Sequence, residues 1–203
     1  NWKVWYFTII YFCLQIAVYG TTFYLPQQVA GLLGQSVGWQ VGLVSAIPWL
    51  VGLFACYIFG RRATTVARRR RYGTLFFVLT GVFILGSALA GASGQPIIGI
   101  LCITIAVASF LSVGPITWSF PTAFLTGAAA AAGIGLINSL GNLGGFVAPI
   151  MRTAVNEAAP TDSGAWGVVS LGVFAFVAAA MFAATRFFRA KSDALLEESA
   201  PQH

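Results

Sequence analysis

The chain has 203 residues, of which 58% are hydrophobic and 8% are charged, and its mean hydropathy is +0.85. Because a soluble domain carries about 25% charged residues, this composition excludes an ordinary soluble protein and predicts an all-α integral membrane protein. The net charge of +6 comes mainly from arginines that flank apolar segments, so it does not indicate a nucleic-acid partner.

Six apolar segments predict six transmembrane helices, which run roughly over residues 4–24, 39–59, 72–92, 97–118, 123–155 and 166–188. They predict a transmembrane bundle over residues 1–188 and a cytoplasmic tail over 189–203. The polar connection over 26–38 has room for a short interfacial helix. Pro115 and Pro149 lie inside the fourth and fifth segments, where prolines bend membrane helices. Since the chain begins with Asn1 and shows no secretory signal, we expect a fragment or a processed chain.

The fifth segment differs from the others because small residues and two amides replace bulky side chains. Gly141 and Gly145 form a GxxxG pair, which lets a neighbouring helix approach closely. Asn138 and Asn142 are four residues apart, so both amides lie on one helix face. The spacing predicts a helix that packs tightly and faces a polar cavity.

Positive charge is distributed unevenly along the chain. With six spans, both termini share one side of the membrane, and ten of the eleven Lys and Arg residues fall on that side. Only Arg152 falls on the other side. The positive-inside rule therefore predicts cytoplasmic termini in the plasma (inner) membrane. The main topology signal is the arginine cluster between the second and third segments, which consists of Arg61, Arg62, Arg68, Arg69, Arg70 and Arg71. Attraction of anionic membrane lipid is a secondary effect of this cluster.

The first three segments resemble the last three in kind. Each set has a helix interrupted by polar residues, then a helix with glycine and proline, then an almost uniformly apolar helix. Three plus three spans have inverted topology, so the pattern predicts a 3+3 inverted repeat.

The membrane segments lack the groups that most catalytic sites need. No Asp or Glu occurs before Glu157, and the only histidine is His203. This excludes a proton relay within these spans and predicts no enzyme activity, no cofactor and no metal site. Arg152 has two interpretations: it extends to the interface, or it attracts an anion at the mouth of a cavity.

Neutral polar residues are then the candidates for substrate binding. Asn138 and Asn142 both donate and accept hydrogen bonds, which suits carboxylates and hydroxyls. Gln15 and Tyr19 lie four apart on the first segment, and Trp118 and Ser119 follow Pro115. The alternative role for these side chains is hydrogen bonding or packing between helices, or a place in the interfacial aromatic belt.

Several motifs carry a resemblance to a known family. They are FYLPQQVAGLLGQS at 23–36, SAIPWLVG at 45–52, the run at 114–149 with NSLGNLGGFVAP at its end, and the arginine-rich loop at 61–71. These motifs resemble the carboxy-terminal half of major facilitator superfamily transporters, and within them the anion:cation symporter family. The loop departs from the family pattern because it contains no acidic residue.

The resemblance implies twelve spans in the complete protein, with substrate bound between two six-helix halves and moved by alternating access. It implies symport of a small organic anion, such as a sugar acid, a dicarboxylate or an aromatic acid. The partner would be an amino-terminal six-helix half outside this chain, which would also hold any coupling acid. The alternative is a non-transporting six-helix membrane protein, such as a channel subunit or a scaffold.

Overall fold

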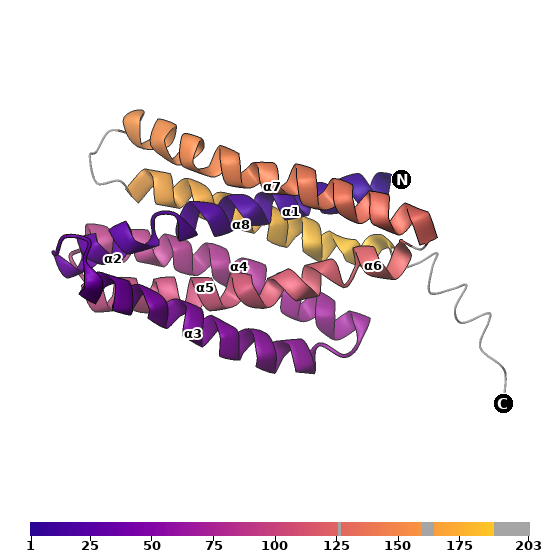
Figure 1. The fold of residues 1–203 in the computed structure, drawn as a ribbon, viewed down its shortest axis with the longest axis horizontal. Coiled ribbons are helices and arrows are strands. Elements are labelled where there is room, and N and C mark those ends of the chain that lie inside the picture. The colour runs from indigo at the N-terminus through magenta and orange to yellow at the C-terminus, as the bar shows by residue number, and fades with distance from the viewer. Residues whose placement is uncertain (126, 160–164, 189–203) are drawn as a thin grey trace.

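The structure is a computed structural model that describes residues 1–125, 127–159 and 165–188. Within these ranges six helices are long and apolar enough to cross a membrane. The predicted tail over 189–203 lies outside the described residues. The long helices, with two short helices and a final 3-10 turn, are α1 (Trp2–Thr22), α2 (Leu25–Leu33), α3 (Trp39–Arg62), α4 (Val66–Ala92), α5 (Pro96–Trp118), α6 (Pro121–Phe124), α7 (Gly127–Glu157), α8 (Ala165–Ala184) and η1 (Thr185–Phe188) (Figure 1).

Two boundaries differ from those expected from hydropathy. Helix α4 begins at Val66 instead of residue 72, because arginine is a good helix former and Thr65 caps the helix, its Oγ1 accepting from the Arg68 N–H at 3.2 Å. The fifth predicted segment is divided, since Pro121–Phe124 forms the separate helix α6. Helix α7 then begins at Gly127, whose φ of 59° is a left-handed conformation that glycine adopts readily.

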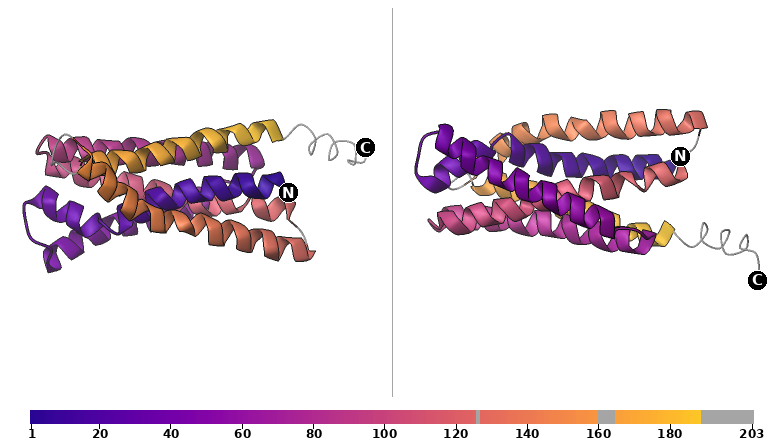
Figure 2. Two further views of the ribbon diagram at one scale, coloured as in Figure 1. Left: turned by 90° about the horizontal axis from the view of Figure 1, so that it is seen from above. Right: turned by 60° about the horizontal axis from the view of Figure 1, so that its bottom comes forward.

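The pairing of the helices confirms the 3+3 inverted repeat. Helix α7 packs along α1, and α3 packs along α5. The inverted repeat relates α1 to α5, α3 to α7 and α4 to α8. The α1–α7 pair therefore corresponds to the α5–α3 pair. The third helices of the two sets, α4 and α8, pack together and so map onto themselves. The views in Figure 2 show the same bundle from two other directions.

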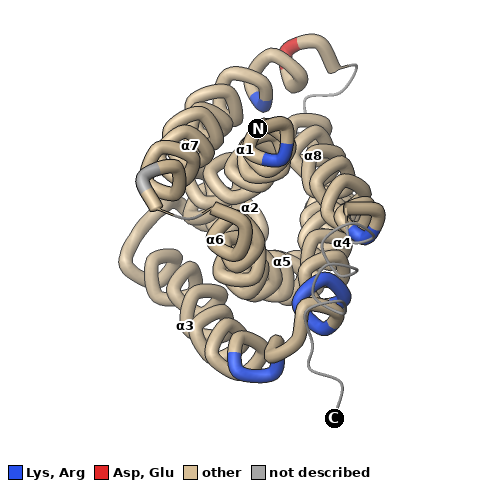
Figure 3. The backbone as a smooth tube through the Cα atoms, turned by 90° about the vertical axis from the view of Figure 1, so that its right-hand side faces the viewer, with Lys and Arg blue, Asp and Glu red and all other residues tan. Residues whose placement is uncertain are grey.

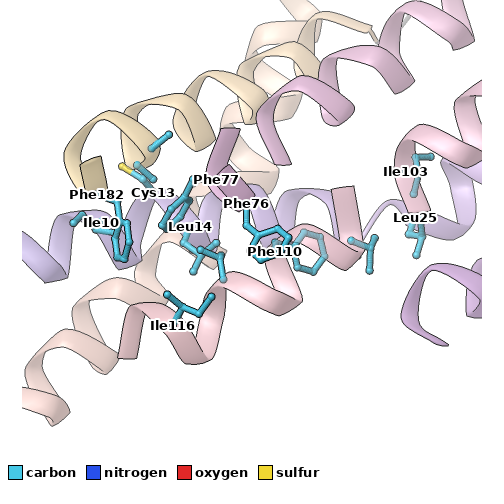
Figure 4. Close-up of a cluster of buried hydrophobic side chains, with 14 of the residues drawn as sticks. Ile10, Cys13, Leu14, Leu25, Phe76, Phe77, Ile103, Phe110, Ile116 and Phe182 are labelled. Carbon is cyan, nitrogen blue, oxygen red and sulfur yellow. The ribbon is translucent and has the colours of Figure 1, made fainter. Parts of the chain in front are cut away.

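Aromatic side chains form much of the buried core between these helices. The Phe77 ring of α4 and the Phe182 ring of α8 are fully buried, and their centroids lie 5.4 Å apart (Figure 4). Ile10 of α1 and Phe110 of α5 belong to the same cluster. Burial of this kind holds α4 against α8, and α8 also packs against both α1 and α7.

The two ends of the bundle differ in charge. At one end, the Phe188 ring lies 4.6 Å from the Trp2 ring, and Arg70 Nε donates to Thr185 Oγ1 at 3.2 Å. This end, viewed in Figure 3, carries Lys3 and the arginine clusters of α3 and α4, and is called the arginine end below. The opposite end carries α2, the turn between α4 and α5, and the start of α8, and is called the α2 end (Figure 1).

Candidate functional site

The interface between α1 and α7 is built on the small residues of α7. A Cβ on Gly141 would meet the Tyr11 ring, and a Cβ on Gly145 would meet the Tyr19 ring. Gly144 lies directly over the α1 backbone at the Phe12 carbonyl. The GxxxG pair therefore contacts a neighbouring helix of the same chain, and α1 and α7 approach each other closely.

Three amide side chains form a hydrogen-bonded chain across this interface. Gln15 Nε2 of α1 donates to Asn142 Oδ1 of α7 at 2.5 Å. Asn142 Nδ2 donates in turn to the Asn138 backbone carbonyl at 2.8 Å and to Asn138 Oδ1 at 2.9 Å. These residues lie near the middle of both helices, far from either end of the bundle. The close approach that Gly144 permits brings the Gln15 side chain within reach of α7.

The three amides are not equivalent in their exposure. Gln15 is buried, Asn142 is half-buried and Asn138 is exposed. Asn138 Oδ1 accepts a hydrogen bond from Asn142 Nδ2. The Nδ2 of Asn138 has no hydrogen-bond partner among the described residues. Gln15 and Asn142 thus hold the helices together and orient Asn138. Asn138 keeps two N–H donors that a bound molecule can reach.

Aromatic rings flank the amide chain on the arginine-end side. The Tyr11 ring lies 4.9 Å from the Trp118 ring of α5 in an edge-to-face arrangement. Trp118 is therefore joined to the α1–α7 interface through Tyr11, a residue that the sequence analysis did not select. Its signal was present, because Tyr11 precedes Gln15 by four residues and so lies on the same face of α1.

The other predicted residues lie away from the amides. Tyr19 packs on Gly145 and lies 5.4 Å from the Phe23 ring, nearer the α2 end. Ser119 Oγ donates to the Ile116 carbonyl of its own helix at 2.6 Å. Pro115 and Pro149 both lie inside continuous helices. Tyr19 and Ser119 therefore remain predictions without a contact to the amide chain.

The predicted topology arginines gather at the arginine end. Arg61 Nη1 donates to the Tyr57 hydroxyl at 2.6 Å, and Arg69 Nε donates to the Ala63 carbonyl at 2.9 Å. Arg62, Arg68 and Arg71 are exposed. Their charges face outward at one end of the helices, where a lipid headgroup or water can solvate them.

Arg152 lies at the other end of the α1–α7 pair. Its Nη1 donates to the Gly20 carbonyl of α1 at 3.2 Å, and its guanidinium carbon lies 3.9 Å from the centre of the Tyr24 ring. The side chain is half-buried and turns towards α1. The side chain also lines a pocket between α2, α4, α5 and α8, and both sequence interpretations remain predictions.

Six apolar helices in an inverted repeat, with a cluster of amides midway along them, define the architecture of a polytopic membrane protein with a polar site at depth. No protein-family model matches the chain. The chain is 38% identical to the inner membrane transport protein RhmT of Escherichia coli (strain K12) over 177 residues, which is 87% of this chain and 40% of that protein.

Two further relatives are also transport proteins. A quinolone resistance transporter of Acinetobacter baumannii is 34% identical over 150 residues, which cover 72% of this chain and 33% of the relative. A candidate tartrate transporter of Agrobacterium vitis is 31% identical over 148 residues, 70% of this chain and 31% of the relative. The chain thus spans less than half the length of these relatives. The comparisons confirm its resemblance to half of a major facilitator-type transporter.

Proposed function

We propose that this chain forms one six-helix half of a secondary active transporter that moves a small organic anion by alternating access. The single observation that carries the proposal is the amide chain of Gln15, Asn142 and Asn138. Polar side chains inside membrane spans commonly mark substrate pathways, and the relatives are transport proteins.

The chemistry of this site suits an oxygen-rich anion. The Asn138 Nδ2 can donate hydrogen bonds to a carboxylate or to a hydroxyl oxygen. The rings of Tyr11 and Trp118 provide an apolar wall beside it. A sugar acid, a dicarboxylate and an aromatic acid all combine these features. The only carboxylate among the described residues is that of Glu157, which is exposed at the end of α7, so the proposal assigns symport coupling to acids of the amino-terminal half.

The exposed surfaces of α3 and α7 are the proposed contact with a partner bundle. These two helices are the least buried of the six candidate spans, and the pseudo-twofold arrangement relates them to each other. Large apolar side chains cover their exposed surfaces, including Leu50 and Phe54 of α3 and Leu143, Phe146 and Ile150 of α7. We assign this surface to the amino-terminal half, with bilayer lipid against the remaining helices.

The proposal places the chain in the plasma (inner) membrane with both termini in the cytoplasm. Its support is the arginine end, where the start of α1, the α3–α4 connection and η1 gather most of the described positive charge. Arginine-rich connections of this length remain on the cytoplasmic side during insertion.

The direct test is uptake by the complete carrier in proteoliposomes. Radiolabelled tartrate, gluconate and benzoate are offered with an inward proton gradient, and each is repeated after a protonophore abolishes the gradient. We expect saturable uptake of one acid that requires the gradient. A correctly inserted carrier that takes up none of the three, while binding none of them, contradicts the proposal.

A further inference from the structure

A pocket of about 390 Å³ opens at the α2 end of the bundle. It lies between α2, the end of α4, the start of α5 and the start of α8, and one side chain of α7 reaches it. This volume falls within the range of about 300–1,000 Å³ that is typical of small-molecule sites. Its polar wall consists of Gln27, Gln28, Ser87, Gln95 and Arg152.

Arg152 gives this pocket a positive charge that no described residue neutralises. Its contacts are the Gly20 carbonyl and the Tyr24 ring, and neither carries a formal charge. The only carboxylate among the described residues is that of Glu157, which is exposed, and the two form no ion pair. A half-buried cation without a counter-ion is costly in a membrane protein, so an anion that enters the pocket is stabilised.

The carboxamides determine what kind of anion fits. Gln27 and Gln95 are exposed at the rim, and neither makes a side-chain hydrogen bond to another described residue. A carboxamide both donates and accepts, so it binds hydroxyl groups as well as carboxylate oxygens. One guanidinium and several amides match a small hydroxylated carboxylate better than a dense multivalent anion such as phosphate.

We propose that this pocket is a second anion site, which holds a small hydroxycarboxylate at the α2 end with Arg152 as its charge partner. It is separate from the amide chain, because Arg152 lies nearly three turns beyond Asn142, about 15 Å along the axis of α7. The site goes beyond the proposed transport function, and a hydroxycarboxylate binds there whether or not the complete protein transports it.

The test measures binding to this chain directly. The purified chain is placed in phosphatidylcholine nanodiscs, and binding of radiolabelled L-tartrate is followed by equilibrium dialysis. We expect saturable binding that Arg152→Gln weakens by at least about tenfold, since it removes the charge-assisted hydrogen bonds. Because Arg152 also contacts Gly20 and Tyr24, a second variant leaves those contacts in place.

That second variant is Gln27→Glu, which adds a carboxylate to the rim of the same pocket. The new charge repels the anion and offsets the charge of the unaltered Arg152, so we again expect binding to weaken by about tenfold or more. Gln35→Glu is the matched control: it makes the same change at the same end of the bundle, on an exposed residue outside this pocket. It should bind tartrate like the unaltered chain.

Three outcomes overturn the proposal. The first is the absence of saturable tartrate binding. The second is binding that both Arg152→Gln and Gln27→Glu leave unchanged, which assigns the ligand to the amide chain instead. The third concerns the source of the anion: if phosphatidylglycerol added to the nanodiscs displaces tartrate, the occupant is a lipid headgroup and not a soluble anion. Unchanged tartrate affinity with that lipid present supports the soluble anion.

Discussion

The contact between Gly144 and α1 makes a sharp prediction about how the site is assembled. A Cβ at Gly144 would collide with the Phe12 carbonyl oxygen and would lie 3.1 Å from the Ile16 amide nitrogen and 3.3 Å from Gln15 Cβ. Two of these three atoms belong to the α1 backbone, which cannot rotate out of the way. Gly144→Ala must therefore push α1 and α7 apart, and it will strain the hydrogen bond between Gln15 and Asn142.

Gly135 offers the matched substitution on the same helix. A Cβ at Gly135 meets no atom within 4 Å, and the residue is exposed. Replacing glycine by alanine inside a helix gains about 0.5–1 kcal/mol of helix propensity, and this gain is common to both variants. The difference between them is then the overpacking cost at Gly144, which is about 1–3 kcal/mol.

The measurement is the free energy of unfolding of each purified variant in mixed micelles of increasing SDS content. We expect Gly135→Ala to match or exceed the unaltered chain, and Gly144→Ala to fall below Gly135→Ala by about 1–3 kcal/mol. Equal stability of the two variants would show that α1 and α7 do not approach as closely as the structure has them, and the reasoning about the amide chain would fail with it.

Three further predictions concern the amides and the missing acids. In the complete carrier, Asn138→Ala lowers uptake without lowering membrane abundance. The control Ser139→Ala, at the adjacent exposed position, leaves both near the unaltered level. Unchanged uptake in Asn138→Ala rules out contact between Asn138 and the substrate. A double-mutant cycle of Gln15→Leu and Asn142→Leu in SDS unfolding gives a coupling of about 0.6–2 kcal/mol, the worth of a hydrogen bond between membrane helices, and additivity of the two changes refutes the bond. This chain alone in liposomes shows no proton-coupled uptake of tartrate, because it provides one wall of a cavity and no acid at depth; gradient-dependent accumulation contradicts this.

The sequence predicted the number of membrane helices well, for a local reason. In a bilayer each backbone N–H and C=O must find its partner within the same helix, so an apolar stretch of sufficient length forms a helix whatever its neighbours are. Hydropathy was less informative at polar ends. It began the third span at Tyr72, whereas α4 begins at Val66, and the exposed Arg68 and Arg71 belong to its first turns.

The sequence also determined that the fifth segment packs closely and carries two amides on one face, since both features follow from helical spacing alone. Only the tertiary structure decided what meets them. Gln15 and Asn142 are separated by 127 positions in the chain, and no local pattern selects α1 rather than another helix as the neighbour of α7. The same holds for Tyr11 against Trp118 and for Arg152 against Gly20. Helix pairing in a membrane depends on the fit of whole surfaces, and that fit is a property of the folded bundle.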